Sequence, residues 1–336
     1  MICSIPYDNK NFDDVLSSVG VAIITFNGEC YIHDQLESIR CQSLPPNRVI
    51  IFDDCSSDKT VELVTKFITR NHLYNWQLFE RDTNVGWRKN IFDALMRCST
   101  DIIFWSDQDD VWDKNKIKTL TALMNDRNCM AAYSSWGYIN SSGTDLKFFS
   151  GNNTERIVQL NNYSKKLDIP PLLGCSACFN RKLISPLSRV IPCEFDSSDW
   201  ILYLLAIILG NVTYLDKPLF KRRVHDKNLT TSLSGMKRNW NFNYGSYKKS
   251  LEILKLQLET IEKITKVTLG TSDISNSFIE NERNYLNCRI NFVEERKKFV
   301  EYLYFSYKQN LFADFVCTLI KDILFVYHST KNSTLI

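Results

Sequence analysis

Short apolar segments alternate with segments of helical periodicity through the first third of the chain. Four of them are short and rich in β-branched or aromatic residues, as expected of strands buried in a sheet: Val19–Phe26, Arg48–Phe52, Trp76–Glu80 and Asp101–Trp105. Between them, apolar residues recur at helical spacing in 32–39, 61–68 and 90–98. The order βαβαβαβ predicts an α/β fold, with a parallel sheet covered by helices on both faces.

The later part of the chain has a different pattern. Met130–Tyr138 and Val212–Leu215 are expected strands, and Ser198–Leu209 is an expected apolar helix. From about residue 246 the apolar residues follow the spacing of long, charged helices. We therefore expect an extension at 1–18, an α/β domain at 19–233 and a helical appendage at 234–336.

Composition narrows the classes of protein. The 336 residues are 44% hydrophobic and 24% charged, which is typical of a globular protein, and the net charge of +3 indicates no nucleic-acid partner. Lys and Arg do gather in 217–238 and 289–298. Those stretches fit either phosphate or anionic lipid on one side, or solvated helix faces on the other.

The cysteines and the chain start indicate a compartment. The eleven cysteines are scattered, and the one C-x-x-C, Cys175 to Cys178, has no second pair to complete a zinc site. Reduced thiols, an N-terminus without signal-peptide character and the absence of an apolar run of ~18 residues predict a cytoplasmic protein that does not cross a membrane.

Polar residues follow the predicted strands at the points where ligands bind to such sheets. Thr25 and Asn27 follow the first strand, Asp53 and Asp54 end the second, and the run Ser106–Asp110 follows the fourth. A carboxylate of the Asp53–Asp54 pair can accept the imide N–H of a pyrimidine base. The alternative is an Asp-rich turn with one helix cap.

Asp107, Asp109 and Asp110 lie within four residues, so their like charges repel one another. A divalent cation relieves that repulsion, and Mg²⁺ or Mn²⁺ prefers oxygen ligands such as these carboxylates and a nucleotide diphosphate. The alternative is a solvated acidic loop.

Two further residues have the chemistry of a transfer site. Asp199 opens the apolar helix, where it is either a general base or a simple N-terminal cap. His225 lies in a basic stretch, where it is either a metal ligand beside cations for a diphosphate or a solvated side chain.

Taken in order, these segments resemble the family 2 glycosyltransferases, from about Val19 to Ser232. The matching segments are VAIITFN at 21–27, IIFDDCSSDKT at 50–60 (resembling DDGS-x-D-x-T, with Cys55 for Gly), Asn84 to Asn90 (N-x-G-x-x-x-N), SDQDDVW at 106–112 (the D-x-D region), GCSACFNR at 174–181, Asp199-Trp200, and Arg223 to Asn228 (R-Q-H-x-x-N). The SDQDDVW form and the last two motifs are similar to a subgroup described as rhamnosyltransferases of polysaccharide assembly, although Ser198 replaces the His of its H-D-W element.

The resemblance implies a GT-A fold, which is a Rossmann-like mixed sheet with helices on both faces, and a role for each matching residue. It places Thr25, Asn27, Asp53, Asp54, Asn84, Gly86, Lys89, Asp107 and Arg223 on the nucleotide-sugar side. It makes Asp109 and His225 the ligands of Mg²⁺ or Mn²⁺ and Asp199 the general base. Gly174, Cys175, Ser176 and Trp200 then lie on the acceptor side, and the role of Asp110 stays open.

The implied reaction is an inverting transfer of a sugar, L-rhamnose for the subgroup, from a dTDP- or UDP-linked donor to a hydroxyl of a lipid-linked bacterial surface polysaccharide. The apolar side of 312–327 then fits an amphipathic helix on the cytoplasmic face of the inner membrane. The same helix fits packing against the catalytic domain or a second copy of the chain.

Two alternatives stay open, and a third is disfavoured. One is an enzyme of the same fold with a UDP-hexose donor, and another is a non-catalytic nucleotide-sugar-binding or assembly protein. The third, a nucleotidyltransferase, needs a Gly-rich phosphate loop, whereas the first strand here ends in Thr-Phe-Asn-Gly.

Overall fold

The computed structural model describes residues 17–125, 128–151, 153–160, 173–190 and 198–226, with the further positions 259, 283, 284, 287, 288 and 290. Most of the expected extension at 1–18 and of the helical appendage at 234–336 therefore lies outside the described residues. The chain divides into two compact units, Met1–Asn161 with Ile169–Arg189 and Ser197–Ser232, and Asn162–Asp168 with Val190–Asp196 and Leu233–Ile336.

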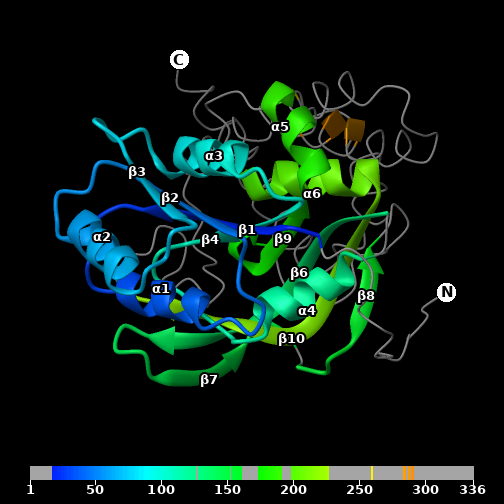
Figure 1. Ribbon diagram of the computed structural model, residues 1–336. Helices are drawn as coiled ribbons and strands as arrows, with labels where there is room; N and C mark the ends of the chain where they lie inside the picture. Colours follow the sequence, from blue (N-terminus) through cyan, green and yellow to red (C-terminus); the bar gives the residue numbers. More distant parts are fainter. Residues whose placement is uncertain are drawn as a thin grey trace, which may run out of the picture. The chain divides into compact units, whose positions relative to one another are not determined.

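The first unit begins with the predicted alternation of strands and helices (Figure 1). Its elements are β1 (Val19–Thr25), α1 (Ile32–Arg40), β2 (Arg48–Asp53), α2 (Thr60–Arg70), β3 (Trp76–Glu80), α3 (Trp87–Arg97) and β4 (Ile102–Ser106). β1 pairs in parallel with β2 and β4, and β2 with β3. The prediction of a parallel sheet is confirmed for these strands.

The rest of the unit makes the sheet mixed. It contains β5 (Val111–Trp112), α4 (Lys116–Leu123), β6 (Cys129–Asn140), β7 (Asp145–Phe149), β8 (Ile157–Leu160), η1 (Gly174–Ser176), β9 (Ala177–Asn180), η2 (Arg181–Leu183), α5 (Ile184–Val190), α6 (Ser198–Leu209) and β10 (Asn211–Val224). The strand order is β3-β2-β1-β4-β9-β6-β10-β5, and β9 is antiparallel to both β4 and β6. A wholly parallel sheet is therefore wrong, and the mixed sheet implied by the resemblance is right.

Helices cover both faces of this sheet. In Figure 1, α3 and α6 lie above the central strands, and α1, α2 and α4 lie below them. α3 packs on β1 and β2, and α6 packs on β6 and β10. Every residue of β1 and of β4 is buried, which explains why their sequences contain no alternation of polar and apolar residues.

β10 is the largest difference from the sequence prediction. A strand was expected only at Val212–Leu215, but β10 continues to Val224 and so includes Arg222 and Arg223. Three basic residues in a row suggest a solvated loop, yet Arg223 is buried, because partners for its charge come from distant parts of the chain.

Candidate active site

Asp53 is held rigidly at the carboxyl end of β2. It pairs in register with Thr25 of β1, whose hydroxyl donates to its Oδ2 at 2.7 Å. The backbone N–H of Ser56 donates to Oδ1 at 2.7 Å and its hydroxyl to Oδ2 at 2.6 Å. Cys55 takes a φ of 65° within this turn, so the cysteine that replaces the family's glycine occupies a left-handed position that glycine favours.

Asp54 closes the loop in front of α3. Its Oδ1 accepts the N–H of Val85 and its Oδ2 that of Gly86, both at 2.8 Å, and the Asn84 side chain donates to its carbonyl at 3.2 Å. Gly86 has a φ of 84°, which a residue with a Cβ rarely adopts. These bonds give Asp54, Asn84 and Gly86 a structural role in addition to the predicted donor contacts.

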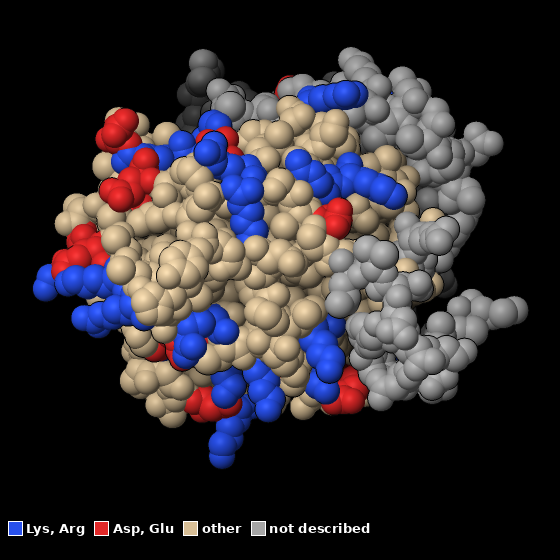
Figure 2. All heavy atoms as spheres, in the orientation of Figure 1, with Lys and Arg blue, Asp and Glu red and all other residues tan. Residues whose placement is uncertain are grey.

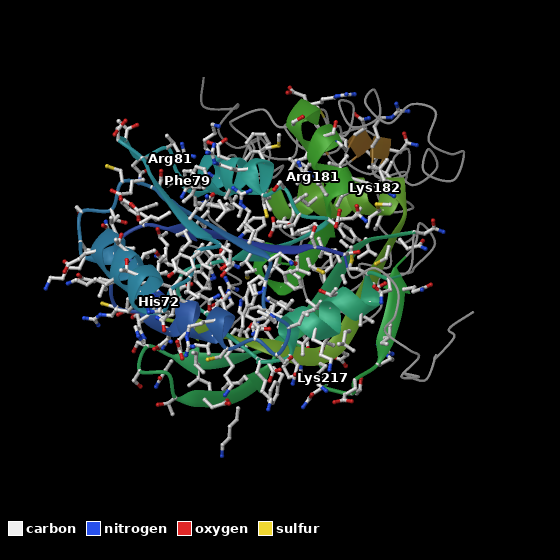
Figure 3. The ribbon with its side chains drawn as sticks, in the orientation of Figure 1. His72, Phe79, Arg81, Arg181, Lys182 and Lys217 are labelled. Carbon is white, nitrogen blue, oxygen red and sulfur yellow. The ribbon has the colours of Figure 1, made fainter. Side chains whose placement is uncertain are left out.

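The basic residues of this region also have partners. Lys89 pairs with Asp93 one turn along α3. Arg81, which follows β3, donates to Asn90 Oδ1 at 2.8 Å and to Asp93 Oδ2 at 2.5 Å. Figure 3 shows Arg81 beside Phe79, next to α3. The end of β3 is thus fixed to the helix that begins at the predicted donor loop.

The loops after β1, β2 and β4 are tied together. Asn27 donates its N–H to Ser56 Oγ at 2.9 Å and accepts the N–H of Ser57 at 2.9 Å. The Gln108 side chain accepts the N–H of Phe26 at 2.8 Å and donates to its carbonyl at 2.9 Å. The carboxyl ends of these strands therefore meet at one edge of the sheet, as ligand binding in such folds requires.

The acidic cluster, formed by Asp107, Asp109 and Asp110, follows β4. Asp107 accepts the indole N–H of Trp105 at 3.0 Å, and Asp110 is 2% exposed, with its Oδ1 accepting the N–H of Arg223 at 3.2 Å. One ligand atom each of Asp107, Asp110 and Cys175 lie within 4.8 Å of one another. The fully solvated acidic loop is therefore excluded, because Asp110 is buried among ionisable groups.

Burial and mutual repulsion perturb the cluster. Burial, reinforced by the charge of Asp109, raises the pKa of Asp107 and holds that of Asp110 well above its ordinary value. Burial also raises the pKa of the Cys175 thiol, and the charges of Asp107 and Asp110 add to the effect. Such a concentration of perturbed groups is typical of functional sites.

The structure brings together Asp109 and His225, to which the resemblance assigns the metal. The Nε2 of His225 lies 2.9 Å from Asp109 Oδ2, and the imidazole stacks on Tyr31 with ring centroids 4.6 Å apart. Imidazole nitrogen and carboxylate oxygen are both ligands that Mn²⁺ accepts, and the metal role of the pair stays a prediction.

Arg223 is more constrained than its predicted role requires. Its Nε donates to the Asp109 carbonyl at 2.9 Å, Nη2 to Asp34 Oδ2 at 2.8 Å, and Nη1 to the Ser141 carbonyl at 3.2 Å. Its guanidinium also lies 4.9 Å from the centroid of the Tyr31 ring. Arg223 therefore orders the loop that carries Asp109, and its contact with a diphosphate stays a prediction.

Two basic side chains beside the cluster, Arg222 and Lys116, were not predicted from the sequence to belong to the site. The charge of Arg222 lowers the pKa values of Asp107 and Asp110, opposing their burial. Lys116 is fully buried: its Nζ donates to the Cys175 carbonyl at 2.6 Å and lies 3.9 Å from the centroid of the Trp112 ring. Burial lowers the pKa of Lys116 to about 8. Only the position of Arg222 next to Arg223 could have suggested it, and nothing in the sequence marked Lys116.

The predicted acceptor side lies on η1 and α6. Gly174 packs so closely on Trp105 that a Cβ would overlap the indole ring, and the Ser176 hydroxyl donates to the Leu173 carbonyl at 2.7 Å. Asp199 is half-buried in the first turn of α6, and its charge adds to the burial that raises the pKa of Tyr133 on β6. Trp200 follows it in the same helix. The roles of these residues toward an acceptor stay predictions.

Comparison with known proteins identifies the family. Residues 20–187 match the model of glycosyl transferase family 2, and the chain belongs to that family.

Named relatives cover different shares of the chain. The dTDP-rhamnosyl transferase RfbG of Shigella flexneri is 26% identical over 273 residues, covering 77% of this chain and 86% of that protein. TuaG of Bacillus subtilis, named for teichuronic acid biosynthesis, is 28% identical over 131 residues, which are 38% of this chain and only 51% of TuaG. The poly(ribitol-phosphate) β-N-acetylglucosaminyltransferase TarS of Staphylococcus aureus is 27% identical over 131 residues and is matched over only 22% of its length.

Solved structures agree on the fold. The S. aureus TarS fragment 1–349 in complex with UDP-GlcNAc aligns with a TM-score of 0.59 at 15% identity, over 94% of this chain and 92% of that one. The same fragment with UDP aligns with a TM-score of 0.56 at 18% identity, over 84% and 74%. The expected GT-A fold is thereby confirmed.

Two further observations concern possible partners. No helix among the described residues is long and apolar enough to cross a bilayer. On the face shown in Figure 2, basic side chains are interspersed with acidic and uncharged ones and do not form one continuous band.

Proposed function

We propose that this chain is an inverting, metal-dependent glycosyltransferase, which moves a sugar from a nucleotide-sugar donor to a hydroxyl of a growing bacterial surface polysaccharide. The observation that carries the proposal is the Asp109–His225 pair, 2.9 Å apart, which joins the acidic cluster to the end of β10. It supplies one carboxylate and one imidazole at the sheet edge where β1, β2 and β4 end. That donor set fits Mn²⁺ or Mg²⁺, whose charge, when bound, neutralises a departing nucleoside diphosphate.

The chain's own residues divide the remaining work. Asp53 accepts hydrogen bonds from Thr25 and Ser56 and keeps one acceptor position, on Oδ1, for the nucleoside. Asp107 is the second nucleoside contact. Arg222, whose charge acts across the cluster, adds positive charge on the donor side.

On the acceptor side Asp199 is the general base. It removes the proton of the acceptor hydroxyl as that oxygen attacks the anomeric carbon, so the reaction is one displacement with inversion. Gly174, Cys175, Ser176 and Trp200 border this side. The close contact of Gly174 with Trp105 joins it to the acidic cluster, because Trp105 donates to Asp107.

The donor we favour is dTDP-L-rhamnose, with a lipid-linked acceptor at the cytoplasmic face of the inner membrane. The similarity to RfbG, which extends over 77% of this chain, supports a rhamnosyl donor. A UDP-hexose is the second candidate, supported by the TarS fragment that is solved with UDP-GlcNAc. The two candidates differ in the base and in the sugar, so a panel of nucleotide sugars separates them.

The test is nucleotide-induced thermal stabilisation with and without Mn²⁺. We expect dTDP or UDP to raise the melting temperature of the full chain, and Mn²⁺ to increase that rise. Asp109→Asn is expected to lose the Mn²⁺-dependent part. The matched control is Asp113→Asn, whose exposed side chain accepts the N–H of Asn115 at 2.8 Å outside the cluster. If neither dTDP nor UDP stabilises the chain, the proposal is contradicted.

A further inference from the structure

Two carboxylates of the acidic cluster lie close to the thiol of Cys175. They come from the loop after β4 and from η1, and one ligand atom of each of Asp107, Asp110 and Cys175 lies within 4.8 Å of the other two. The backbone around Cys175 is fixed, because Lys116 donates to its carbonyl at 2.6 Å. These three side chains are therefore held close enough together to share one ion.

A second observation points to a ligand at this place. Asp110 is 2% exposed, and within the part of the chain that the structure describes its Oδ2 has no hydrogen-bond partner, while its Oδ1 accepts the N–H of Arg223. Buried acceptors without a partner are rare in folded proteins. The carboxylate that carries this oxygen forms the group with Asp107 and Cys175, and a cation bound there is the kind of partner that the oxygen lacks.

The ligand atoms decide which cation fits. Hard cations such as Mg²⁺ and Mn²⁺ select oxygen, whereas a thiolate selects softer ions such as Zn²⁺. The Asp109–His225 pair contains no sulfur. The thiol therefore distinguishes this site from that pair by its chemistry.

We propose that Asp107, Asp110 and Cys175 form a second cation site, which takes a thiophilic divalent cation such as Zn²⁺. Binding forms a bond between the metal and the Cys175 sulfur, and the thiol proton leaves to solvent. Since Asp107 is also the proposed nucleoside contact, an ion here competes with the donor nucleotide. This competition rests on the proposed function, whereas the metal site does not.

The first experiment uses Cd²⁺ as a probe, because cadmium–thiolate bonds absorb in the ultraviolet. The full chain carries Cys30→Ser, Cys41→Ser and Cys55→Ser, which remove the thiols that are exposed in the described residues. We expect one saturable absorbance band, which reports the bond between Cd²⁺ and the thiolate. Adding Cys175→Ser removes the band, whereas Cys178→Ser, at an equally buried position three residues further on, keeps it. An unchanged band after Cys175→Ser overturns the proposal.

A second variant guards against misfolding of the first. Asp110→Asn keeps the thiol and the acceptor for the Arg223 N–H, and we expect it to weaken Cd²⁺ binding at least 10-fold. Unaltered affinity in a variant that melts no lower than the wild type contradicts the site. A large excess of Mn²⁺ should leave the band in place, and Asp109→Asn should keep it. Loss of the band in Asp109→Asn overturns the claim of two separate sites.

The competition has its own measurement. Zn²⁺ should lower the affinity of the Cys175-containing chain for dTDP or UDP, and Cys175→Ser should abolish that effect. If Cd²⁺ binds as expected but no nucleotide does, the proposed function fails and the metal site stands. If nucleotides bind with Mn²⁺ and the Cd²⁺ band is absent, the metal site fails and the proposed function stands.

Discussion

Replacing Asp110 with asparagine should stabilise the metal-free chain at neutral pH. The wild-type carboxylate is 2% exposed, and in the described residues its Oδ2 has no partner. An unsatisfied buried polar group costs about 1–3 kcal/mol, and more when it is charged. Asparagine removes the charge, keeps an oxygen for the N–H of Arg223 and places an N–H₂ donor toward Asp107 and Cys175.

The expected gain is therefore about 1–3 kcal/mol, which for a domain of this size corresponds to a rise in melting temperature of roughly 2–12 °C. The pH dependence has a definite sign. The pKa of Asp110 in the folded chain is well above its ordinary value, so the folded state retains a proton that the unfolded chain has lost above about pH 4. Wild-type stability thus falls as the pH rises above that value, and the advantage of asparagine grows with it.

The assay is thermal unfolding followed by circular dichroism, with a chelator present, at pH 5, 6 and 7.5. Asp113→Asn, at an exposed position, is the matched control and should leave the melting temperature unchanged at every pH. If Asp110→Asn melts at or below the wild-type temperature at pH 7.5, the cluster carries no unrelieved electrostatic cost, and the reasoning is refuted.

Two further predictions concern the base and the donor loop. Asp199→Asn should retain Mn²⁺-dependent nucleotide binding and lose transfer by a factor of about 10²–10⁴, as measured by product formation; normal transfer rules out the assigned base. Gly86→Ala should lower the free energy of unfolding by about 1–3 kcal/mol, because Gly86 has a φ of 84° and a ψ of 150°, a region that is essentially restricted to glycine, although a Cβ there would touch nothing. Equal denaturant midpoints contradict this prediction.

The first strands could be predicted because their burial in the sheet determines their own amino-acid composition. β1, β2 and β4 are buried on both faces and therefore apolar at almost every position. The alternation of these strands with helices also predicted parallel pairing, which the pairs β1–β2 and β2–β3 confirm.

The second half resisted prediction because its pairings join distant residues. β9 has only four residues, and it lies antiparallel between β4 and β6. Its partners are distant in sequence, 74 residues for the pair Phe104↔Cys178 and 46 residues for Ala132↔Cys178, and no local signal marks them. Pairing over such distances is decided by the tertiary structure.

The site was predicted in part for the same reasons. Residues that directly follow strands, such as Asp53 and Asp107, could be assigned to one edge of the sheet from the strand order alone. The buried cations could not be assigned in this way, because the local sequence around a lysine in a charged segment does not show whether its side chain is solvated or buried. Lys116 is buried against Trp112 and Phe220, and Phe220 lies 104 residues further along the chain.

The most direct test of the central claim is turnover of nucleotide sugars by the full chain. The protein is incubated with dTDP-L-rhamnose and a panel of UDP-hexoses, with and without Mn²⁺, and release of the nucleoside diphosphate is measured. We predict Mn²⁺-dependent release from one donor of the panel, lost in Asp109→Asn and kept in Asp113→Asn. Release that is equal in Asp109→Asn and the wild type, or no release from any donor in the presence of Mn²⁺ and acceptor, contradicts the account.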